Sequence, residues 1–193
     1  MRDLDNSINY INKLHPNIYN SIIKYTTDYY KTLNNRLEAI ESIDTAEGDI
    51  EDNLPLNMAY DVRNIDAAFD SAPPLTKDLV VYRGLHFPIS DAEDVPRRLP
   101  TIMGNAYKGR YQGYLSTSLN RGVAYDFAKR EYQDCIIMKI HIKKGTRVLF
   151  LHVHSVTRSE YEVLLPRNSI LEIYSIKKDM DDNLCTYIKT KLN

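Results

Sequence analysis

Residues 135–153 read CIIMKIHIKKGTRVLFLHV, and the second half of the chain is expected to form a sheet because of patterns like this one. Two runs, 135–142 and 146–153, are rich in β-branched and apolar residues. Between them lies Lys143-Lys144-Gly145, which has the composition of a turn. We therefore predict two strands joined by a hairpin-like turn.

Further β patterns lie on both sides of this stretch. A short β-rich run at 78–84 stops at Gly84, and one helix is expected at about 120–131. Three more strands are predicted after the hairpin, at 162–166, 170–176 and 184–190.

The first third of the chain follows a helical period instead. Apolar residues recur at helical spacing over 4–14, 19–40 and 58–69. Pro16 suits the first turn of the second of these helices. The acidic segment 44–53 contains a glycine and is predicted to be a solvated loop.

Helices first and mostly hairpin-linked strands after them predict an α+β fold, with N-terminal helices followed by a mostly antiparallel β core. The chain contains no internal repeat, low-complexity tract or clear linker. We therefore expect a single domain over 1–193, with a helical part at 1–72 and a β-rich core at 73–193.

Composition narrows the class of protein. Of 193 residues, 43% are hydrophobic and 26% are charged, which is typical of a soluble globular fold. The formal net charge is −1 and no long basic run is present, so we expect no nucleic-acid partner. No apolar run approaches the roughly 20 residues that span a bilayer, so we expect no membrane partner.

The N-terminus MRDLDNSINY lacks the apolar core of a secretory signal, so we expect the cytoplasm, either of the producing cell or of a target cell. Cys135 and Cys185 show no CxxC pairing, so we expect reduced thiols. We also expect a monomer.

Three short motifs carry the residues of chemical interest. They are Tyr82-Arg83-Gly84, Ser116-Thr117-Ser118 and Glu160-Tyr161-Glu162. Each is ordinary by itself: an arginine at a strand end usually makes a surface ion pair, and a Ser-Thr-Ser run usually faces solvent. Two glutamates at i and i+2 on a strand share one face of the sheet.

Together and in this order, the motifs resemble those of the arginine-specific mono-ADP-ribosyltransferases of the R-S-E class. That family includes the enzymatic subunits of bacterial binary toxins and modifying enzymes of some phages. Phe127 and Arg130 follow where similar members carry a phenylalanine and an arginine for NAD⁺. The segment SEYEVLLPRNS, 159–169, looks like the Glu-x-Glu strand of the family.

The resemblance implies that NAD⁺ is the co-substrate and that no metal takes part. Arg83 and Arg130 would grip the two phosphates, because a guanidinium is a planar fork that is always charged. The backbone at Gly84 would hold the nicotinamide amide. The ring of Phe127 would lie against the nicotinamide, although it fits a core position equally well. The implied NAD⁺-binding residues are Tyr82, Arg83, Gly84, Ser116, Thr117, Phe127, Arg130 and Glu162.

The implied catalytic residues are Arg83, Ser116, Glu160 and Glu162. Breaking the nicotinamide–ribose bond builds positive charge on the sugar, which the carboxylate of Glu162 would stabilise while Ser116 orients it. Glu160 would face the same side and attract, orient and help deprotonate an arginine side chain of a target protein. In this family a glutamate here accompanies arginine acceptors.

Other interpretations remain open. An NAD⁺ glycohydrolase would use the same Arg83, Ser116 and Glu162, with water as the acceptor. A catalytically silent NAD⁺-binding or interaction module is a third possibility. His152 and His154 share a strand face, but no CxxC or HExxH motif accompanies them as a zinc site would require. As sources we expect a phage or virus enzyme, or an injected effector.

Overall fold

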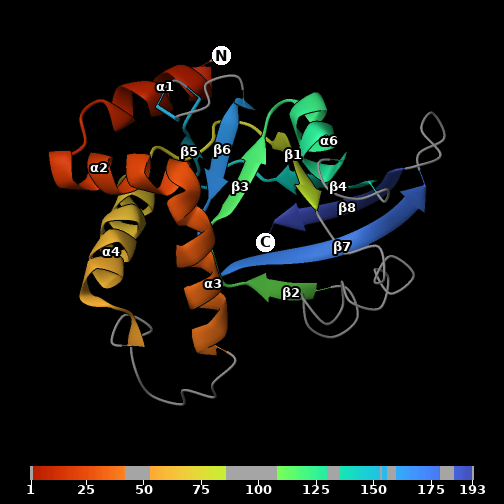
Figure 1. The fold of residues 1–193 in the computed structure, drawn as a ribbon. Helices are drawn as coiled ribbons and strands as arrows, with labels where there is room; N and C mark the ends of the chain where they lie inside the picture. Colours follow the sequence, from red (N-terminus) through yellow and green to blue (C-terminus); the bar gives the residue numbers. More distant parts are fainter. Residues whose placement is uncertain are drawn as a thin grey trace.

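The structure is a computed structural model that describes residues 2–41, 53–85, 108–129, 135–152, 154–155, 160–178 and 185–192. Helices occupy the first part of the chain and strands most of the rest, so the predicted α+β class is confirmed. Figure 1 shows the N-terminal helices gathered beside the sheet and helix α6 lying apart from them.

The N-terminal helices begin and end close to the predicted positions. Pro16 opens the second helix, as expected for a residue whose missing N–H would have no partner in the first turn. Among the described residues, no helix is long and apolar enough to span a membrane. The helices are α1 (Arg2–Ile11), α2 (Pro16–Lys24), the π-helical turn η1 (Tyr25–Tyr29), α3 (Tyr30–Glu41), α4 (Leu56–Ser71) and α6 (Arg121–Lys129).

The continuous helical stripe predicted over 19–40 is interrupted in η1. Thr27 has φ −89° and ψ −174°, which is not helical. The hydroxyl of Thr26 donates to the Ile23 carbonyl at 2.8 Å, and that of Thr27 donates to the Lys24 carbonyl at 2.6 Å. Threonine hydroxyls compete with the helix ladder in this way, and two in succession give a physical reason for the kink.

The strands form one eight-stranded sheet in the order β2-β7-β8-β4-β1-β3-β6-β5. All neighbours are antiparallel except β4 and β8. The parallel register of this pair places Cys135 opposite Cys185. The strands are β1 (Leu79–Leu85), β2 (Lys108–Tyr111), β3 (Leu115–Ser118), β4 (Cys135–Ile142), β5 (Leu149–Phe150), β6 (Glu162–Leu165), β7 (Ser169–Lys178) and β8 (Cys185–Leu192).

The hairpin predicted over 135–153 is wrong. Strand β4 pairs with β1 and β8, whereas β5 has only two residues and pairs with β6 at the far edge of the sheet. The turn itself exists, with Gly145 at φ 92°, but its backbone bonds to Leu75 rather than closing a hairpin. The chain therefore passes from the middle of the sheet to its β5 edge after this turn. Strand β2 was not predicted.

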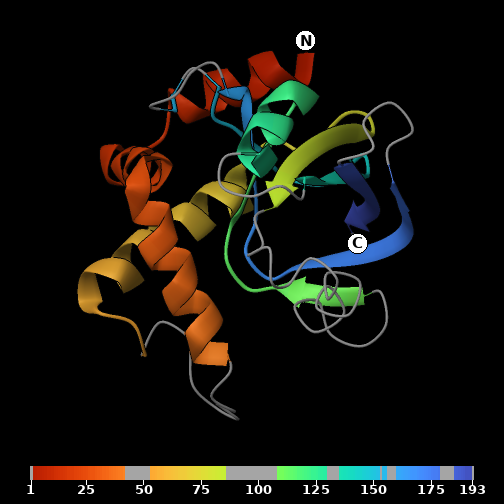
Figure 2. The ribbon, with the colours of Figure 1, turned by 45° about the vertical axis from the view of Figure 1, so that its right-hand side comes forward.

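Apolar side chains from both ends of the sheet share a core. Phe150 of the edge strand β5 and Leu171 of β7, next to the other edge, belong to the same buried cluster, which the curvature of the sheet in Figure 2 makes possible. A second cluster joins the N-terminal helices to the opposite side of β6, where Leu164 contacts it. A third and smaller cluster lies under α6.

A buried polar junction fixes the helices to the segment that leads into β3. The side-chain amide of Asn34 donates to the Tyr114 carbonyl at 3.0 Å and accepts from the Tyr114 N–H at 3.1 Å. The hydroxyl of Tyr25 donates to the same carbonyl at 3.0 Å. Gly113 makes room for this contact, because a Cβ there would lie 2.6 Å from the Asn34 Oδ1. Helix α3 thus sets the position of the residues just before Ser116.

We predict that Asn34→Ala destabilises the fold. The substitution leaves the buried Tyr114 N–H without its acceptor, and an unsatisfied buried group costs about 1–3 kcal/mol. Thermal unfolding should show this as a Tm lower by roughly 2–4 °C for each ~1 kcal/mol lost. Asn35→Ala, at the exposed neighbouring position, is the matched control. An equal Tm for both variants would contradict the role of the junction.

Candidate functional site

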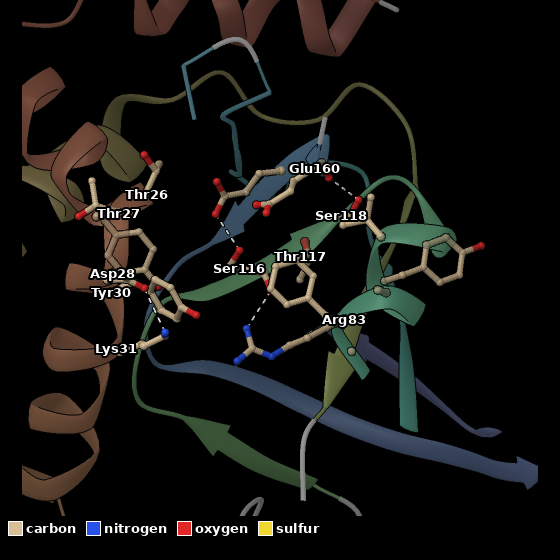
Figure 3. A pocket seen from close by; sticks show the side chains of 17 residues that line it. Thr26, Thr27, Asp28, Tyr30, Lys31, Arg83, Ser116, Thr117, Ser118 and Glu160 are labelled. Atoms are coloured by element: carbon tan, nitrogen blue, oxygen red, sulfur yellow. Dashed lines mark hydrogen bonds and ion pairs between the residues drawn. The ribbon is translucent and has the colours of Figure 1, made fainter. Parts of the chain in front are cut away.

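The described residues line a cavity of about 630 Å³ between the η1–α3 helices, the strands β1 and β3, and helix α6. This volume lies within the range of cofactor and small-ligand sites. Figure 3 shows the wall formed by η1 and α3 on one side and Arg83 with Ser116 on the other. The lining comprises Tyr25, Thr26, Thr27, Asp28, Tyr30, Lys31, Tyr82, Arg83, Gly84, Ser116, Thr117, Ser118, Val123, Ala124, Phe127, Glu160 and Glu162.

Arg83 is held on β1 by groups from two other strands. Its Nη1 donates to the Ser116 carbonyl at 2.8 Å, and its Nη2 donates to the Tyr111 hydroxyl at 3.3 Å. The guanidinium carbon also lies 5.5 Å from the centre of the Tyr111 ring. Its buried Nε has no hydrogen-bond partner among the described residues. The guanidinium is therefore fixed at the wall of the cavity, where a planar and always charged group suits an anionic ligand such as a phosphate.

Ser116 and Glu162 lie on the adjacent strands β3 and β6. The Ser116 hydroxyl donates to Glu162 Oε1 at 2.7 Å, and Glu162 is only 5% exposed. Burial raises the pKa of Glu162 above its ordinary value of 4.5, and the nearby charge of Glu160 raises it further. The hydrogen bond from Ser116 lowers it, because it favours the charged form.

Ser155 is a second hydroxyl partner of Glu162. Its side chain hydrogen-bonds the carboxylate and lowers the pKa of Glu162, as Ser116 does. The backbone explains this placement: the Leu151 N–H donates to the Glu162 carbonyl at 2.9 Å, and the Ser155 N–H donates to the Leu151 carbonyl at 2.6 Å. Ser155 is 5% exposed. A tight turn beside β6 thus returns its hydroxyl to the carboxylate.

Glu160 reaches the cavity by a route that differs from the prediction. We expected Glu160 and Glu162 to share one face of a strand, but β6 begins only at Glu162. Tyr161 between them has φ 48°, in the left-handed region. The Glu160 carbonyl accepts a hydrogen bond from Ser118, at 2.5 Å. Both carboxylate residues nevertheless line the same cavity.

The other predicted NAD⁺-binding residues are placed as follows. Thr117 lines the cavity, while its hydroxyl donates to the Val163 carbonyl at 2.6 Å. Gly84 lies so close to α6 that a Cβ would overlap the Ala124 carbonyl, which explains the glycine by packing. Tyr82 and Phe127 also line the cavity, and Arg130 lies outside the described residues.

The two histidines singled out in the sequence contact different aromatic rings. His152 stacks on Tyr161, and His154 meets Tyr19 edge to face. Within the part of the chain that the structure describes, no group of three or more His, Cys, Asp or Glu is arranged to hold a metal ion.

Sequence reasoning missed three contributors to this site: Tyr111, Ser155 and the wall formed by η1. The contact of Tyr111 with Arg83 leaves no local signal, because the two residues are 28 positions apart and their strands are not paired. The adjacent threonines of η1 were a usable signal, since they disfavour an uninterrupted helix.

The family of the chain is shown by a match that covers nearly its whole length. Residues 5–192 match the model of the ADP-ribosyltransferase exoenzyme family. The chain therefore belongs to the ADP-ribosyltransferase exoenzyme family. Transferases of this family use NAD⁺ as the donor of ADP-ribose.

One curated relative is the NAD(+)–arginine ADP-ribosyltransferase EFV of Enterococcus faecalis. It is 29% identical over 166 residues, which cover 85% of this chain. The match spans only 30% of the length of that relative.

Solved structures share the fold. C3stau2 of S. aureus, solved with NAD, superposes with a TM-score of 0.74 at 22% identity, covering 100% of this chain and 94% of the other. The C3 exoenzyme of Clostridium limosum gives a TM-score of 0.73 at 21% identity, covering 98% and 94%. At these identities the likeness concerns the fold alone.

We predict that Ser155→Ala moves the pH dependence of NAD⁺ cleavage. Loss of a donor to the carboxylate raises the pKa of Glu162 further, so the fall in rate on the acid side should begin at a higher pH. A hydrogen bond to a charged group contributes about 1.5–3 kcal/mol, so the acid side of the profile should move up by about 1–2 pH units.

Ser169→Ala is the matched control, because Ser169 is also buried but donates to the Pro166 carbonyl instead. Nicotinamide release is measured across pH for both variants. Identical pH profiles in Ser155→Ala and Ser169→Ala would remove Ser155 from this role.

Proposed function

We propose that this chain transfers ADP-ribose from NAD⁺ to an arginine side chain of a target protein and releases nicotinamide. The observation that carries the proposal is the pair of carboxylates, Glu160 and Glu162, in one cavity with the fixed guanidinium of Arg83. Only one carboxylate is needed to break the glycosidic bond, so the second has a separate task.

Arg83 is assigned to the phosphates of NAD⁺. Its orientation is set by Ser116 and Tyr111, and its planar, always charged guanidinium lines the cavity and suits phosphate oxygens. Phe127 and Tyr82 supply apolar ring surface in the same cavity, and Gly84 lines it where α6 packs closely on its backbone. Arg130 is retained from the sequence as a second phosphate contact.

Glu162 is assigned to the bond that breaks. Cleavage of the nicotinamide–ribose bond leaves positive charge on the sugar, and a fixed carboxylate beside that charge lowers the barrier. Two hydroxyls, from Ser116 and Ser155, hold the carboxylate and favour its charged form despite burial. In this scheme neither serine acts as a nucleophile.

Glu160 is assigned to the acceptor. An arriving guanidinium is protonated, and a carboxylate attracts it, orients it and accepts a proton as the new N–C bond forms. The name of the Enterococcus faecalis relative, an arginine ADP-ribosyltransferase, supports arginine as the acceptor here.

We also propose that the helical part and the β-rich core act as one unit. The wall of the cavity includes η1, and the Asn34–Tyr114 junction joins α3 to the segment before β3. The ion pair between Asp66 of α4 and Arg167, with N and O 2.7 Å apart, adds a second link.

NAD⁺ glycohydrolase activity is the second candidate. It would use Arg83, Ser116 and Glu162 with water in place of the acceptor. The presence of Glu160 in the cavity favours transfer, because hydrolysis has no need of a carboxylate directed at a cationic acceptor.

We predict that Glu162→Gln abolishes both transfer and NAD⁺ hydrolysis while the protein becomes more stable at neutral pH. The amide keeps the volume but lacks the charge that faces the sugar cation, which should cost about 10²-fold or more in rate. Because folding raises the pKa of Glu162, the ionised carboxylate destabilises the fold above that pKa.

The gain in Tm of Glu162→Gln should therefore shrink as the pH falls and the wild-type carboxyl group becomes protonated. Tm measured across pH and nicotinamide release test the two parts separately. Near-normal turnover in this variant would refute the catalytic assignment, and a lower Tm at neutral pH would refute the stability assignment.

We predict that Glu160→Gln reduces transfer to arginine far more than it reduces NAD⁺ hydrolysis. Glu162 still stabilises the sugar cation, whereas the guanidinium loses its anionic partner and water reacts instead. Transfer should fall by about 10²-fold, as for removal of one proton-transfer group.

Two assays on the variant measure this: nicotinamide release without acceptor, and labelling of agmatine from labelled NAD⁺. Glu172→Gln on β7, whose carboxylate pairs with Lys191 outside the cavity, is the control. Equal loss in both assays would assign Glu160 to the sugar or to the fold. Labelling of a protein that resists hydroxylamine would point to an acceptor other than arginine.

A further inference from the structure

Asp61 of α4 is a buried carboxylate that lies outside the described lining of the cavity. It is 4% exposed. A buried charge is costly unless hydrogen bonds and an opposite charge compensate it. Here the Ser21 hydroxyl donates to Oδ1 at 2.8 Å, while the Lys24 ammonium and the Tyr29 hydroxyl donate to Oδ2 at 2.5 and 2.9 Å.

Two of these donors flank the part of η1 that lines the cavity. Lys24 is the last residue of α2 and Tyr29 is the last residue of η1, and the four residues between them, 25–28, all line the cavity. Figure 3 shows this wall on the side opposite Arg83. Neither Lys24 nor Tyr29 belongs to the described lining. One carboxylate oxygen of Asp61 therefore holds both ends of the wall from outside the cavity.

The helix has to depart from α geometry for one oxygen to reach both donors. In a regular α-helix, residues five apart point about 140° apart around the axis, because each residue turns it by about 100°. The wider π-helical turn of η1, with its non-helical Thr27, brings Lys24 and Tyr29 to the same side. The Lys24 ammonium also lies 4.0 Å from the centre of the Tyr29 ring. The kink and the hydrogen bonds to Asp61 thus belong to one arrangement.

We propose that Asp61 is a positioning residue for NAD⁺: its carboxylate holds both ends of η1, so that residues 25–28 form the cavity wall before the dinucleotide binds. The inference rests on the proposed use of this cavity for NAD⁺. Asp61 itself touches no substrate atom in this scheme. A wall that is ordered in advance avoids the entropy cost of ordering it on binding.

The groups assigned to the chemistry are held by other elements. Glu162 receives hydrogen bonds from Ser116 and Ser155. Arg83 donates to the Ser116 carbonyl. None of these contacts involves α4. Loss of the hydrogen bonds to Asp61 should therefore weaken NAD⁺ binding and leave the cleavage of bound NAD⁺ nearly unchanged.

The test removes the donors at the two ends of η1 and keeps the carboxylate. Substitution of Asp61 itself would also destabilise the packing of α2 on α4, because it leaves three donors without their acceptor. Lys24→Met and Tyr29→Phe each remove one donor to Oδ2 with little change in shape, and the double variant removes both. Ser21→Ala is the matched control, because it removes the donor to Oδ1, which lies within α2 and not at an end of η1.

Two readouts separate binding from chemistry. One is the Kd of a carbocyclic NAD⁺ analogue, which resists cleavage, by calorimetric titration; the other is kcat and KM for nicotinamide release without an acceptor. The double variant should raise Kd and KM by roughly 10-fold, as expected if the wall is in place in about a tenth of the unbound molecules. Each single variant should raise them by roughly 3-fold, and kcat should stay within about twofold. Ser21→Ala should lower the Tm but keep the wild-type Kd and KM.

An unchanged Kd in the double variant would overturn the proposal, and so would an equal rise in Kd for Ser21→Ala. A fall in kcat at unchanged KM would also overturn it, because the loss would then lie in the chemistry. A wild-type protein that neither binds nor cleaves NAD⁺ would refute the proposed function and this proposal with it. Cleavage of NAD⁺ without transfer to arginine, together with the expected rise in Kd, would refute the acceptor assignment and support the role of Asp61.

Discussion

The hydrogen bond from Ser116 to Glu162 is the interaction on which the arrangement of the site depends. Glu162 is 5% exposed, and this burial disfavours the charged carboxylate and raises its pKa. Hydrogen bonds from two serine hydroxyls favour the charged form and lower that pKa. Ser116 comes from the neighbouring strand and Ser155 from the turn after β5. The carboxylate is therefore held from both sides of β6, which fixes its direction as well as its ionisation.

The placement of Ser116 beside Glu162 also depends on the N-terminal helices. Ser116 lies on β3. The residue before β3, Tyr114, is held by hydrogen bonds from the side chains of Asn34 and Tyr25 to its backbone. The same helices supply the cavity wall at η1, where Thr27 departs from helical geometry. The helices thus shape the site and do more than cover the sheet.

Local patterns in the sequence predicted which segments form helices and strands, but not how the strands pair. The runs of β4 and β6 were recognisable, whereas the hairpin after 142 failed because β5 pairs with a strand outside that stretch. The three motifs meet in one cavity, as the resemblance implied. Ser155 was missed because its contact with Glu162 depends on a backbone turn that no composition rule marks.

Glu160 and Glu162 line the same cavity, as predicted, but not because they lie on one strand. Side chains at i and i+2 on a strand do share one face, but a strand would also hold both carboxylates at equivalent depth. The left-handed Tyr161 breaks this equivalence, so that Glu162 belongs to β6 while Glu160 precedes it. One carboxylate is thereby fixed by the sheet and the other by a turn. The two tasks that we propose for these carboxylates, stabilising a sugar cation and receiving a guanidinium, call for such a difference.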